Sequence, residues 1–325
     1  MTRPPTDHVR AAPVPAGRWR KYLSPELWHK NLVHLHLRGR EAAWRLWRPP
    51  LREPIFVVGC SRAGTTVTYE TLALAEGLMT LGYETPQLWH RIWGPWHNGW
   101  ASEAATWEEA RPEHAARARA WWWARLGNRG RLLDKTCINV MRVGYLARLF
   151  PDAHFVYVHR DGRDNVSSLI DGWRKGDHFA LRQYLGPLPE PVAIEHGEFD
   201  DWRFFLPPGW RDYNRASLAE VCAWQWIQAN TLALEARARV APGHWHVLRY
   251  EDLLEDPVGA FERLYGDLGL AFTPAIRRHC AELGRHATSI VSGPPRKEKW
   301  KERNPEAVES ILERIAPLQA RLGYA

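Results

Sequence analysis

Cysteine is scarce in this chain of 325 residues, and long apolar runs are absent from it. The four cysteines, Cys60, Cys137, Cys222 and Cys280, lie far apart and form no C-x-x-C pair. This spacing argues against a disulfide scaffold and against a structural zinc site. No apolar run approaches the ~18 residues of a membrane span, and residues 1–20 lack the apolar core of a signal peptide. We therefore expect a cytoplasmic protein with no transmembrane segment and no required metal.

Acidic residues are outnumbered, with 37 Asp and Glu against 44 Lys and Arg, and the formal net charge is +7. A basic chain suits anionic ligands. The basic residues are nevertheless scattered and no base-reading motif appears, so a nucleic acid partner is not expected. The length allows one large core. We predict a single domain over residues 51–325, preceded by a basic and aromatic helical extension over residues 1–50.

The predicted extension has two parts. Residues 1–17 are rich in proline and alanine, which indicates disorder. Residues 19–47 are basic, aromatic and helix-like, and Ser24 followed by Pro25 has the residue types of a helix start. This segment is a candidate for peripheral membrane contact, for docking on its own domain, or for pairing with a second copy in a homodimer. The sequence leaves the three open.

The most informative stretch runs from Pro54 to Thr66 and reads PIFVVGCSRAGTT. An apolar run stops at Gly59, and the loop after it ends at Gly64, which predicts a buried parallel strand, a loop and a helix starting near Thr65. Backbone N–H groups between the two glycines can surround an anion, and the positive end of the helix points toward it. The spacing matches the phosphate-binding skeleton G-x-x-x-x-G-[KT]-[ST].

The loop lacks the lysine by which P-loop ATPases and kinases reach the β- and γ-phosphates, because position 65 is a threonine. Arg62 instead offers a forked cation that suits a single phosphate. SRAGTT after a PIFVVG strand resembles the 5′-phosphosulfate loop of sulfotransferases that use 3′-phosphoadenosine-5′-phosphosulfate (PAPS). The candidate donor-binding residues of this loop are Ser61, Arg62, Ala63, Gly64, Thr65 and Thr66.

A second strand-to-helix junction reads VYVHRDGRDNVSSL. It places Arg160 at a strand end and Ser168 about two turns into the next helix, where a charged fork and a hydroxyl could converge on an anion. The motif resembles the R-D-[PG]-R-D-x-x-x-S signature with which sulfotransferases bind the 3′-phosphate. Without the first loop, the same charges would read as a surface ion-pair network. Together the two motifs imply PAPS as donor, PAP as product, and a P-loop-like three-layer α/β fold with a central parallel sheet flanked by helices.

Two further blocks extend the resemblance, the first to the family at large and the second to its protein-tyrosine sulfotransferase branch. LRYEDLLEDP resembles a segment whose tyrosine lies near the nucleotide, which implies a PAPS contact for Tyr250 and a bracing role for Glu251. KEKWKERNPEAV resembles the carboxyl end of that branch, which carries a basic 3′-phosphate loop. Arg296, Lys297 and Lys299 are the candidates in that loop, and spacing does not tell which of them faces inward.

The same block-wise match suggests the catalytic groups. Glu84 in LGYETPQLW falls where the tyrosyl branch has its catalytic glutamate, and Lys135 in LDKT falls where it has a lysine that stabilises the leaving phosphate. A carboxylate at a strand end can take the acceptor's proton, and a lysine can offset the charge that develops as the bond breaks. His90 is the alternative base. If the family resemblance is set aside, the sequence is equally compatible with Glu84 as a surface acid paired with Arg91.

The remaining pattern predicts further elements around these motifs. The Trp-rich residues 86–123 read as a helical insertion, and the Pro-rich residues 186–215 as a long loop that serves as a lid or a substrate wall. Most of the 19 tryptophans are expected in the core. Four strands are predicted at 79–83, 131–135, 154–159 and 245–250, and a last helix at 304–323.

The sequence therefore predicts an enzyme, a PAPS-dependent sulfotransferase acting on a hydroxyl or, as a weaker expectation, an amine. The acceptor is not identified: a small molecule, a peptide, a lipid or a glycan each fits Trp-rich walls. Two alternatives stay open, a P-loop nucleotide kinase or NTPase and a non-catalytic PAPS-fold binding module.

Overall fold

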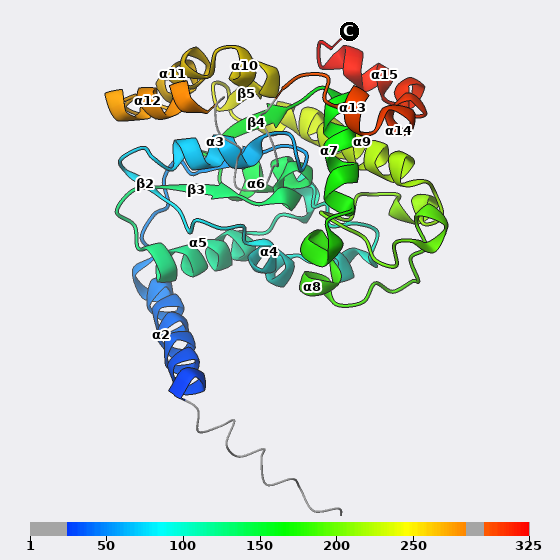
Figure 1. The fold of residues 1–325 in the computed structure, drawn as a ribbon. Coiled ribbons are helices and arrows are strands. Elements are labelled where there is room, and N and C mark those ends of the chain that lie inside the picture. Colours follow the sequence, from blue (N-terminus) through cyan, green and yellow to red (C-terminus); the bar gives the residue numbers. More distant parts are fainter. Residues whose placement is uncertain (1–24, 284–295, 325) are drawn as a thin grey trace, which may run out of the picture.

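The computed structural model describes residues 25–283 and 296–324, so the disorder predicted for residues 1–17 lies outside the described residues. A five-stranded sheet in the order β2-β3-β1-β4-β5 forms the centre (Figure 1). Every pair of neighbouring strands is parallel. The strands are β1 (Ile55–Val58), β2 (Leu78–Met79), β3 (Arg131–Lys135), β4 (His154–His159) and β5 (Trp245–Arg249).

Helices cover both faces of the sheet and complete three layers (Figure 1). The central strand β1 is buried on both faces: Ile55 and Val57 join one core cluster, whereas Phe56 and Val58 join the other. This confirms the predicted α/β class, because a strand covered on both sides reads as a continuous apolar run. One layer holds α3 (Thr65–Leu72), α10 (Tyr250–Glu255), α11 (Pro257–Asp267) and α12 (Pro274–Glu282), and the larger layer holds α4 (Pro86–Ile92), α5 (Pro112–Leu126), α6 (Val143–Leu149), α7 (Gly162–Trp173), α8 (Arg182–Leu185) and α9 (Leu218–Ala236).

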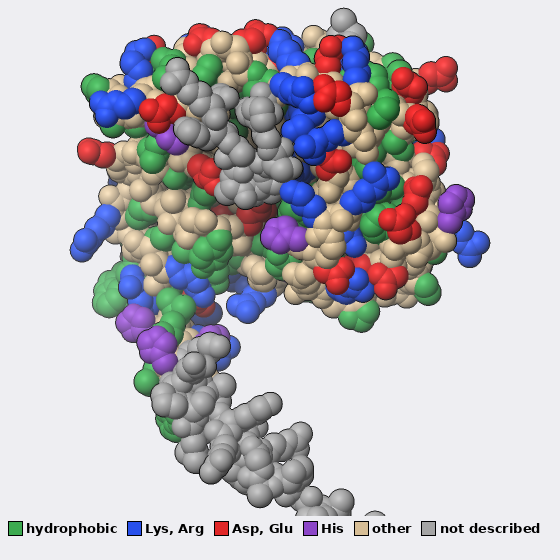
Figure 2. Space-filling view, viewed as in Figure 1, with side chains coloured by type: hydrophobic (Ala, Val, Ile, Leu, Met, Phe, Trp, Pro, Cys, Tyr) green, Lys and Arg blue, Asp and Glu red, His purple; other side chains and the backbone are tan. Residues whose placement is uncertain are grey.

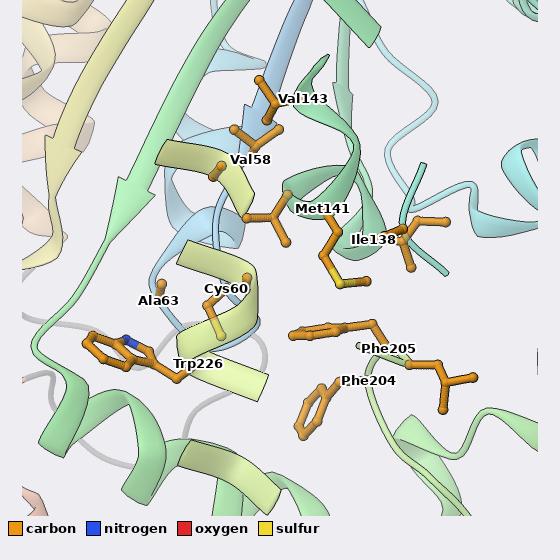
Figure 3. Close-up of a cluster of buried hydrophobic side chains, with 14 of the residues drawn as sticks. Val58, Cys60, Ala63, Ile138, Met141, Val143, Phe204, Phe205 and Trp226 are labelled. Carbon is orange, nitrogen blue, oxygen red and sulfur yellow. The ribbon is translucent and has the colours of Figure 1, made fainter. Parts of the chain in front are cut away.

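The larger core cluster supports the loop that follows β1. Cys60 and Ala63 of this loop are fully buried and belong to the same cluster as Trp226 of α9. These apolar anchors hold the loop in one position, because a close-packed interior tolerates little displacement. Figure 3 shows the three residues together with Val58, Ile138, Met141, Val143, Phe204 and Phe205.

Eight of the eighteen tryptophans within the described residues are buried, fewer than expected for the core. Six of them are among the largest fully buried side chains, and two of the six come from the Pro-rich segment 186–215. Isolated backbone bridges between Ala180 and Arg203 and between Ile194 and Phe199 also hold this segment. The segment is therefore packed against the core, and Phe204 is its residue on the cavity described below. The six are Trp89, Trp122, Trp173, Trp202, Trp210 and Trp226.

The strand predicted over residues 79–83 is shorter than expected. Only Leu78 and Met79 pair with β3. Gly82 adopts a φ of 78°, and its N–H donates to the Tyr69 hydroxyl at 3.0 Å, so the chain turns away from the sheet edge. A side chain of α3 thus competes with strand pairing at this edge.

The last predicted helix is divided in the structure. It comprises α14 (Pro305–Glu309) and α15 (Leu312–Arg321), preceded by the short α13 (Trp300–Arg303). Asn304 does not cap α14 with its side chain. Its amide Nδ2 instead donates to Ser167 Oγ at 2.9 Å and to Asp171 Oδ1 at 3.1 Å, both on α7. Asn304 therefore links the C-terminal helices to α7 through hydrogen bonds.

The extension forms α2 (Pro25–Trp47), which projects from the body and meets it near α5 (Figure 1). Trp44 is buried at this contact, and Arg125 of α5 donates to Glu41 at 2.9 Å. Among the described residues, no helix combines the length and the apolar character needed to cross a membrane. Docking on the chain's own domain, one of the three expectations for this segment, accounts for its last turns.

Candidate active site

Four strands end at one edge of the sheet, and a candidate residue stands at each end. β1 runs into the loop 59–64, β3 ends in Lys135, β4 is followed by Arg160, and β5 by Tyr250. Because the strands are parallel, their carboxyl ends meet at the edge where open α/β sheets bind ligands. A cavity of about 420 Å³ opens there, and Lys135, Arg160, Tyr250 and the loop residues Gly59, Ser61, Arg62 and Gly64 line it. Ala63, a predicted donor contact, does not line the cavity and instead packs in the core.

Two glycines shape the loop after β1. A Cβ on Gly59 would stand 2.3 Å from the carbonyl oxygen of Val158, so β1 and β4 approach this closely only without a side chain there. Gly64 has a φ of 101° and precedes α3, and a Cβ on it would lie 2.5 Å from the Tyr250 ring. The loop backbone and the positive end of α3 therefore stay accessible to an anion.

Two arginines converge beside the loop. Arg62, with a left-handed φ of 71°, donates from Nε to Ser168 Oγ at 3.3 Å. Arg160 donates to the carbonyl oxygen of Arg62 at 3.3 Å, and its guanidinium lies 4.5 Å from the Tyr250 ring centroid. Burial, and then the charge of Arg160, lowers the pKa of Arg62. Two enclosed guanidinium groups that lie side by side favour the binding of an anion near them.

The third basic segment contributes two of its three candidates. Arg296 and Lys299 line the cavity, whereas Lys297 pairs at the surface with the last residue of α10. The Asp164 carboxylate on α7 decides this orientation, because it accepts from the backbone N–H groups of residues 298 and 300 at 2.8 and 3.1 Å. Sequence spacing did not tell which of the three basic residues faces inward, and this tertiary contact determines it.

Glu84 and Lys135 form an ion pair in the same cavity. Lys135 Nζ lies 2.5 Å from Glu84 Oε1 and also donates to Thr66 Oγ1 of α3 at 3.2 Å. The second carboxylate oxygen of Glu84 accepts from the Cys137 N–H at 2.8 Å. Glu84 is thus not paired with Arg91. Lys135 connects the carboxylate to the start of the helix that follows the loop.

His90 lies in a more enclosed position in the cavity wall. Its Nε2 is 2.6 Å from Glu103 Oε1, and both residues are buried. Since a carboxylate only accepts, Nε2 carries a proton in this pair. The second ring nitrogen, Nδ1, has no hydrogen-bond partner in the described part of the chain. Glu103 is held in turn by the Leu206 N–H, which donates to its other oxygen at 2.7 Å.

Comparison with known proteins identifies the family. The model of the family described as "Sulfotransferase family" matches residues 54–188 and 201–274, which include β1, β3, β4, β5 and the residues following them. The chain belongs to the sulfotransferase family. This confirms the resemblance drawn from the two phosphate-binding motifs.

Individual relatives are more distant. Protein-tyrosine sulfotransferase 1 of Danio rerio is 27% identical over 206 residues, an alignment covering 59% of this chain and 48% of that protein. The chain thus spans about half the length of the curated relative that it matches. The crystal structure of sulfotransferase STF9 from Mycobacterium avium has a TM-score of 0.55 at 14% identity and covers 90% of this chain and 82% of that one. It shares the fold.

Sequence reasoning missed a buried residue that supports the site of this sulfotransferase. Asp134, next to Lys135, accepts from Asn139 Nδ2 at 2.9 Å and from Thr85 Oγ1 at 3.3 Å. Burial raises its pKa to about 7; hydrogen bonds oppose this rise, and the charge of Glu84 adds to it. The sequence does carry a signal for this residue, because an acidic side chain stands within the apolar run of β3. Because Thr85 follows Glu84, this buried network ties the Glu84 segment to the end of β3.

The far wall of the sulfotransferase cavity is largely apolar and aromatic. A chain of contacts connects it to Glu84, since Cys137 Sγ donates to the Phe204 carbonyl oxygen at 3.4 Å. Besides the residues already described, the polar lining includes Gln87, Lys175 and His178. The cavity therefore has a basic end beside the loop 59–64 and an apolar end. Phe179 lies where the two meet, with its ring centroid 5.9 Å from the guanidinium carbon of Arg62. The apolar lining comprises Tyr83, Pro86, Ile138, Phe179, Leu181, Tyr184 and Phe204.

Proposed function

We propose that the protein transfers the sulfuryl group of PAPS to the hydroxyl group of an apolar, aromatic acceptor and releases PAP. One observation carries the proposal: Lys135 contacts both Thr66, at the anion-binding end of the cavity, and the Glu84 carboxylate. A cation placed between a phosphate site and a candidate base is what transfer of a charged group requires.

The basic end is proposed to hold the donor. The loop 59–64 and the start of α3 bind the 5′-phosphate through backbone N–H groups, in the manner of a helix N-terminus. Arg160 and Ser168 bind the 3′-phosphate, and Arg296 and Lys299 complete that side. This assignment is supported by the position of all four side chains on one cavity. Hydrogen bonds to a charged group are also stronger than those between neutral groups.

The transfer step needs one base and one group that stabilises the leaving oxygen. Glu84 takes the proton of the acceptor hydroxyl as its oxygen forms a bond to sulfur. The bond between sulfur and the bridging oxygen breaks, its electron pair stays on the phosphate of PAP, and Lys135 offsets the charge there. We assign the base to Glu84, with His90 as the less favoured candidate, because Lys135, which also contacts Thr66 at the anion-binding end, contacts Glu84 directly. His90 is buried, and its unpaired nitrogen Nδ1 is enclosed in the wall.

The apolar end is proposed to select the acceptor. Four aromatic side chains, Tyr83, Phe179, Tyr184 and Phe204, line it. Rings pack favourably edge-to-face or offset on other rings, so a phenol, either free or as a tyrosyl side chain, fits better than a sugar. The tyrosyl relative is consistent with this choice.

A cytoplasmic location is part of the proposal and is supported by four cysteines that are all free thiols.

An acceptor panel tests the proposal. Purified protein is incubated with PAPS carrying a radiolabelled sulfuryl group and with phenols, tyrosyl peptides, aliphatic alcohols, amines and sugars, and labelled products are separated. We expect transfer to phenolic hydroxyls and PAP as the second product. Transfer to sugars alone would reassign the acceptor. Binding of ATP with Mg²⁺, without binding of PAP, would place the protein among the P-loop kinases instead.

A further inference from the structure

The projecting helix α2 carries an apolar stripe, which we call the outer seam, that nothing in the described structure covers. Its six residues recur at alternating intervals of four and three, and every one of them is exposed. At 3.6 residues per turn, these intervals keep them on one narrow side of the helix. Figure 2 shows hydrophobic side chains on the surface of the projecting helix. The outer seam comprises Trp28, Leu32, Leu35, Gly39, Ala42 and Leu46.

The opposite side of α2 holds the helix on its own domain. Trp44, which lies about half a turn from the outer seam, is 6% exposed. On the same side, Glu41 pairs with Arg125 of α5 at 2.9 Å. Arg40 donates to the Trp123 carbonyl oxygen at 3.2 Å. One apolar side is enough to dock a helix on its own domain, so the outer seam calls for a second partner.

The intervals of the outer seam are those of paired helices. Residues that repeat at four and three occupy the a and d positions of a heptad, and their side chains fill spaces on a facing helix with the same repeat. A helix that docks on a broad surface has a wider apolar face. The outer seam is narrow, because Asn31 and Arg38 border it on one side and His29 and His36 border it on the other. Its width therefore favours a second helix over a lipid surface.

Gly39, in the middle of the outer seam, meets no requirement for glycine within the described chain. A Cβ added to it would meet no other part of that chain within 4 Å, and the residue lies inside the helix. Glycine in a helix interior is less favourable than alanine. A second helix that crosses here explains the glycine, because two backbones approach most closely where a side chain is absent. Ala42, about one turn further along, extends this point of close approach.

The borders of the outer seam fit a second copy of the same helix. One border is basic through Arg38, whereas the other, with His36 and Ala43, carries no formal charge at pH 7. In a parallel pair, each border faces the other border of the partner helix, so the Arg38 of each copy lies opposite the Ala43 of the other. An antiparallel pair over the same residues would instead bring the two Arg38 side chains together. Charge therefore favours the parallel pair.

We propose that two copies of the chain pair in parallel along the outer seams of α2 and form a homodimer with two-fold symmetry. The leucines of the outer seam become buried between the two helices, and the backbones come closest at Gly39. Because the docked side of α2 is opposite the outer seam, each helix keeps its contact with its own domain. The dimer does not depend on the sulfotransferase activity.

Sedimentation equilibrium of the full-length chain tests the dimer. We expect a monomer–dimer equilibrium that shifts toward the dimer as salt rises, because each copy carries a net charge of +7 and salt screens the repulsion. Leu35→Glu should weaken dimerisation at least about 100-fold, since each of the two copies loses a buried leucine worth about tenfold or more. The matched control is Val33→Glu, which should dimerise as the wild type does. Val33 is also exposed on α2 but lies nearly half a turn from Leu35.

Disulfide cross-linking tests the parallel orientation. Leu35→Cys should form a covalent dimer under mild oxidation, because each residue of the outer seam meets its own counterpart in a parallel pair. Val33→Cys and the wild type should stay unlinked, since the four native cysteines lie outside α2. Circular dichroism of each variant checks that the fold is intact.

Three results would overturn the proposal. The first is a wild type that stays monomeric at its highest soluble concentration. The second is a dimer that Leu35→Glu leaves intact, and the third is equal cross-linking of Leu35→Cys and Val33→Cys. Binding of a monomeric wild type to vesicles of anionic lipid would assign the outer seam to a lipid surface instead.

Discussion

Replacing Arg160 by alanine is the sharpest test of the donor site. Arg160 is 8% exposed and lies against the Tyr250 ring, with its Nε unpaired in the described part of the chain. We propose that this fork binds the 3′-phosphate of PAP. Adenosine 5′-monophosphate (AMP) lacks that phosphate, so it reports on the rest of the site. A PAPS enzyme should therefore bind PAP more tightly than AMP, and the difference should depend on Arg160.

The expected magnitude follows from the type of contact. A hydrogen bond to a charged group contributes roughly 1.5–3 kcal/mol. At 1.4 kcal/mol per tenfold, loss of the arginine should weaken PAP binding by about 10- to 150-fold. Arg160 also donates to the Arg62 carbonyl oxygen at 3.3 Å. Any loosening of the loop should weaken AMP and PAP alike, so the ratio of the two affinities isolates the 3′-phosphate.

Isothermal titration calorimetry of both ligands on both proteins is the assay. Arg163→Ala is the matched control, because Arg163 belongs to the same motif but pairs with Asp161 and does not line the cavity. Its ratio of PAP to AMP affinity should stay that of the wild type. In the basic C-terminal segment, Lys299→Ala should weaken PAP binding while Lys297→Ala should not, since only Lys299 lines the cavity.

One result would refute this reasoning. If the wild type bound PAP and AMP equally well, the guanidinium of Arg160 would not contact a 3′-phosphate, and Arg160 would serve only to hold the loop. The assignment of Arg160 to the 3′-phosphate of the donor would then be wrong, although the membership of the sulfotransferase family would not change.

Three further predictions concern the residues around the acceptor. Glu84→Gln should lower kcat by roughly 10²–10⁴-fold with PAP affinity nearly unchanged, and His90→Gln much less; near-normal turnover of the Glu84 variant would reassign the base. Lys135→Ala should lower kcat on the order of 10²–10³-fold, whereas a change confined to the acceptor KM would place the lysine on the acceptor side. Burial raises the pKa of Asp134 to about 7, so the folded protein retains a proton that the unfolded chain releases above about pH 4. The free energy of unfolding should therefore fall by up to about 4 kcal/mol between pH 4 and 7, and Asp134→Asn should remove this part of the fall; identical pH slopes in urea titrations of both proteins would contradict it.

The amino-acid sequence by itself predicted the two motifs that we propose bind the donor. Its signals are local: the glycines at 59 and 64 permit a close strand contact and a left-handed turn, and Arg160 and Ser168 sit eight residues apart across a strand-to-helix junction. Such motifs keep their geometry because one strand, one loop and one helix generate it. The family match confirmed that the chain is a sulfotransferase.

Only the tertiary structure decided which groups surround Glu84 and how the basic C-terminal segment is oriented. Asp164 on α7 determines that Lys299 and not Lys297 lines the cavity, although the two lie two residues apart. Burial at the centre of the sheet, which no motif encodes, raises the pKa of Asp134. His90 and Glu103 meet because the chain between them folds back on itself. Each of these features depends on contacts between distant segments, and packing of the complete core, rather than local spacing, brings those segments together.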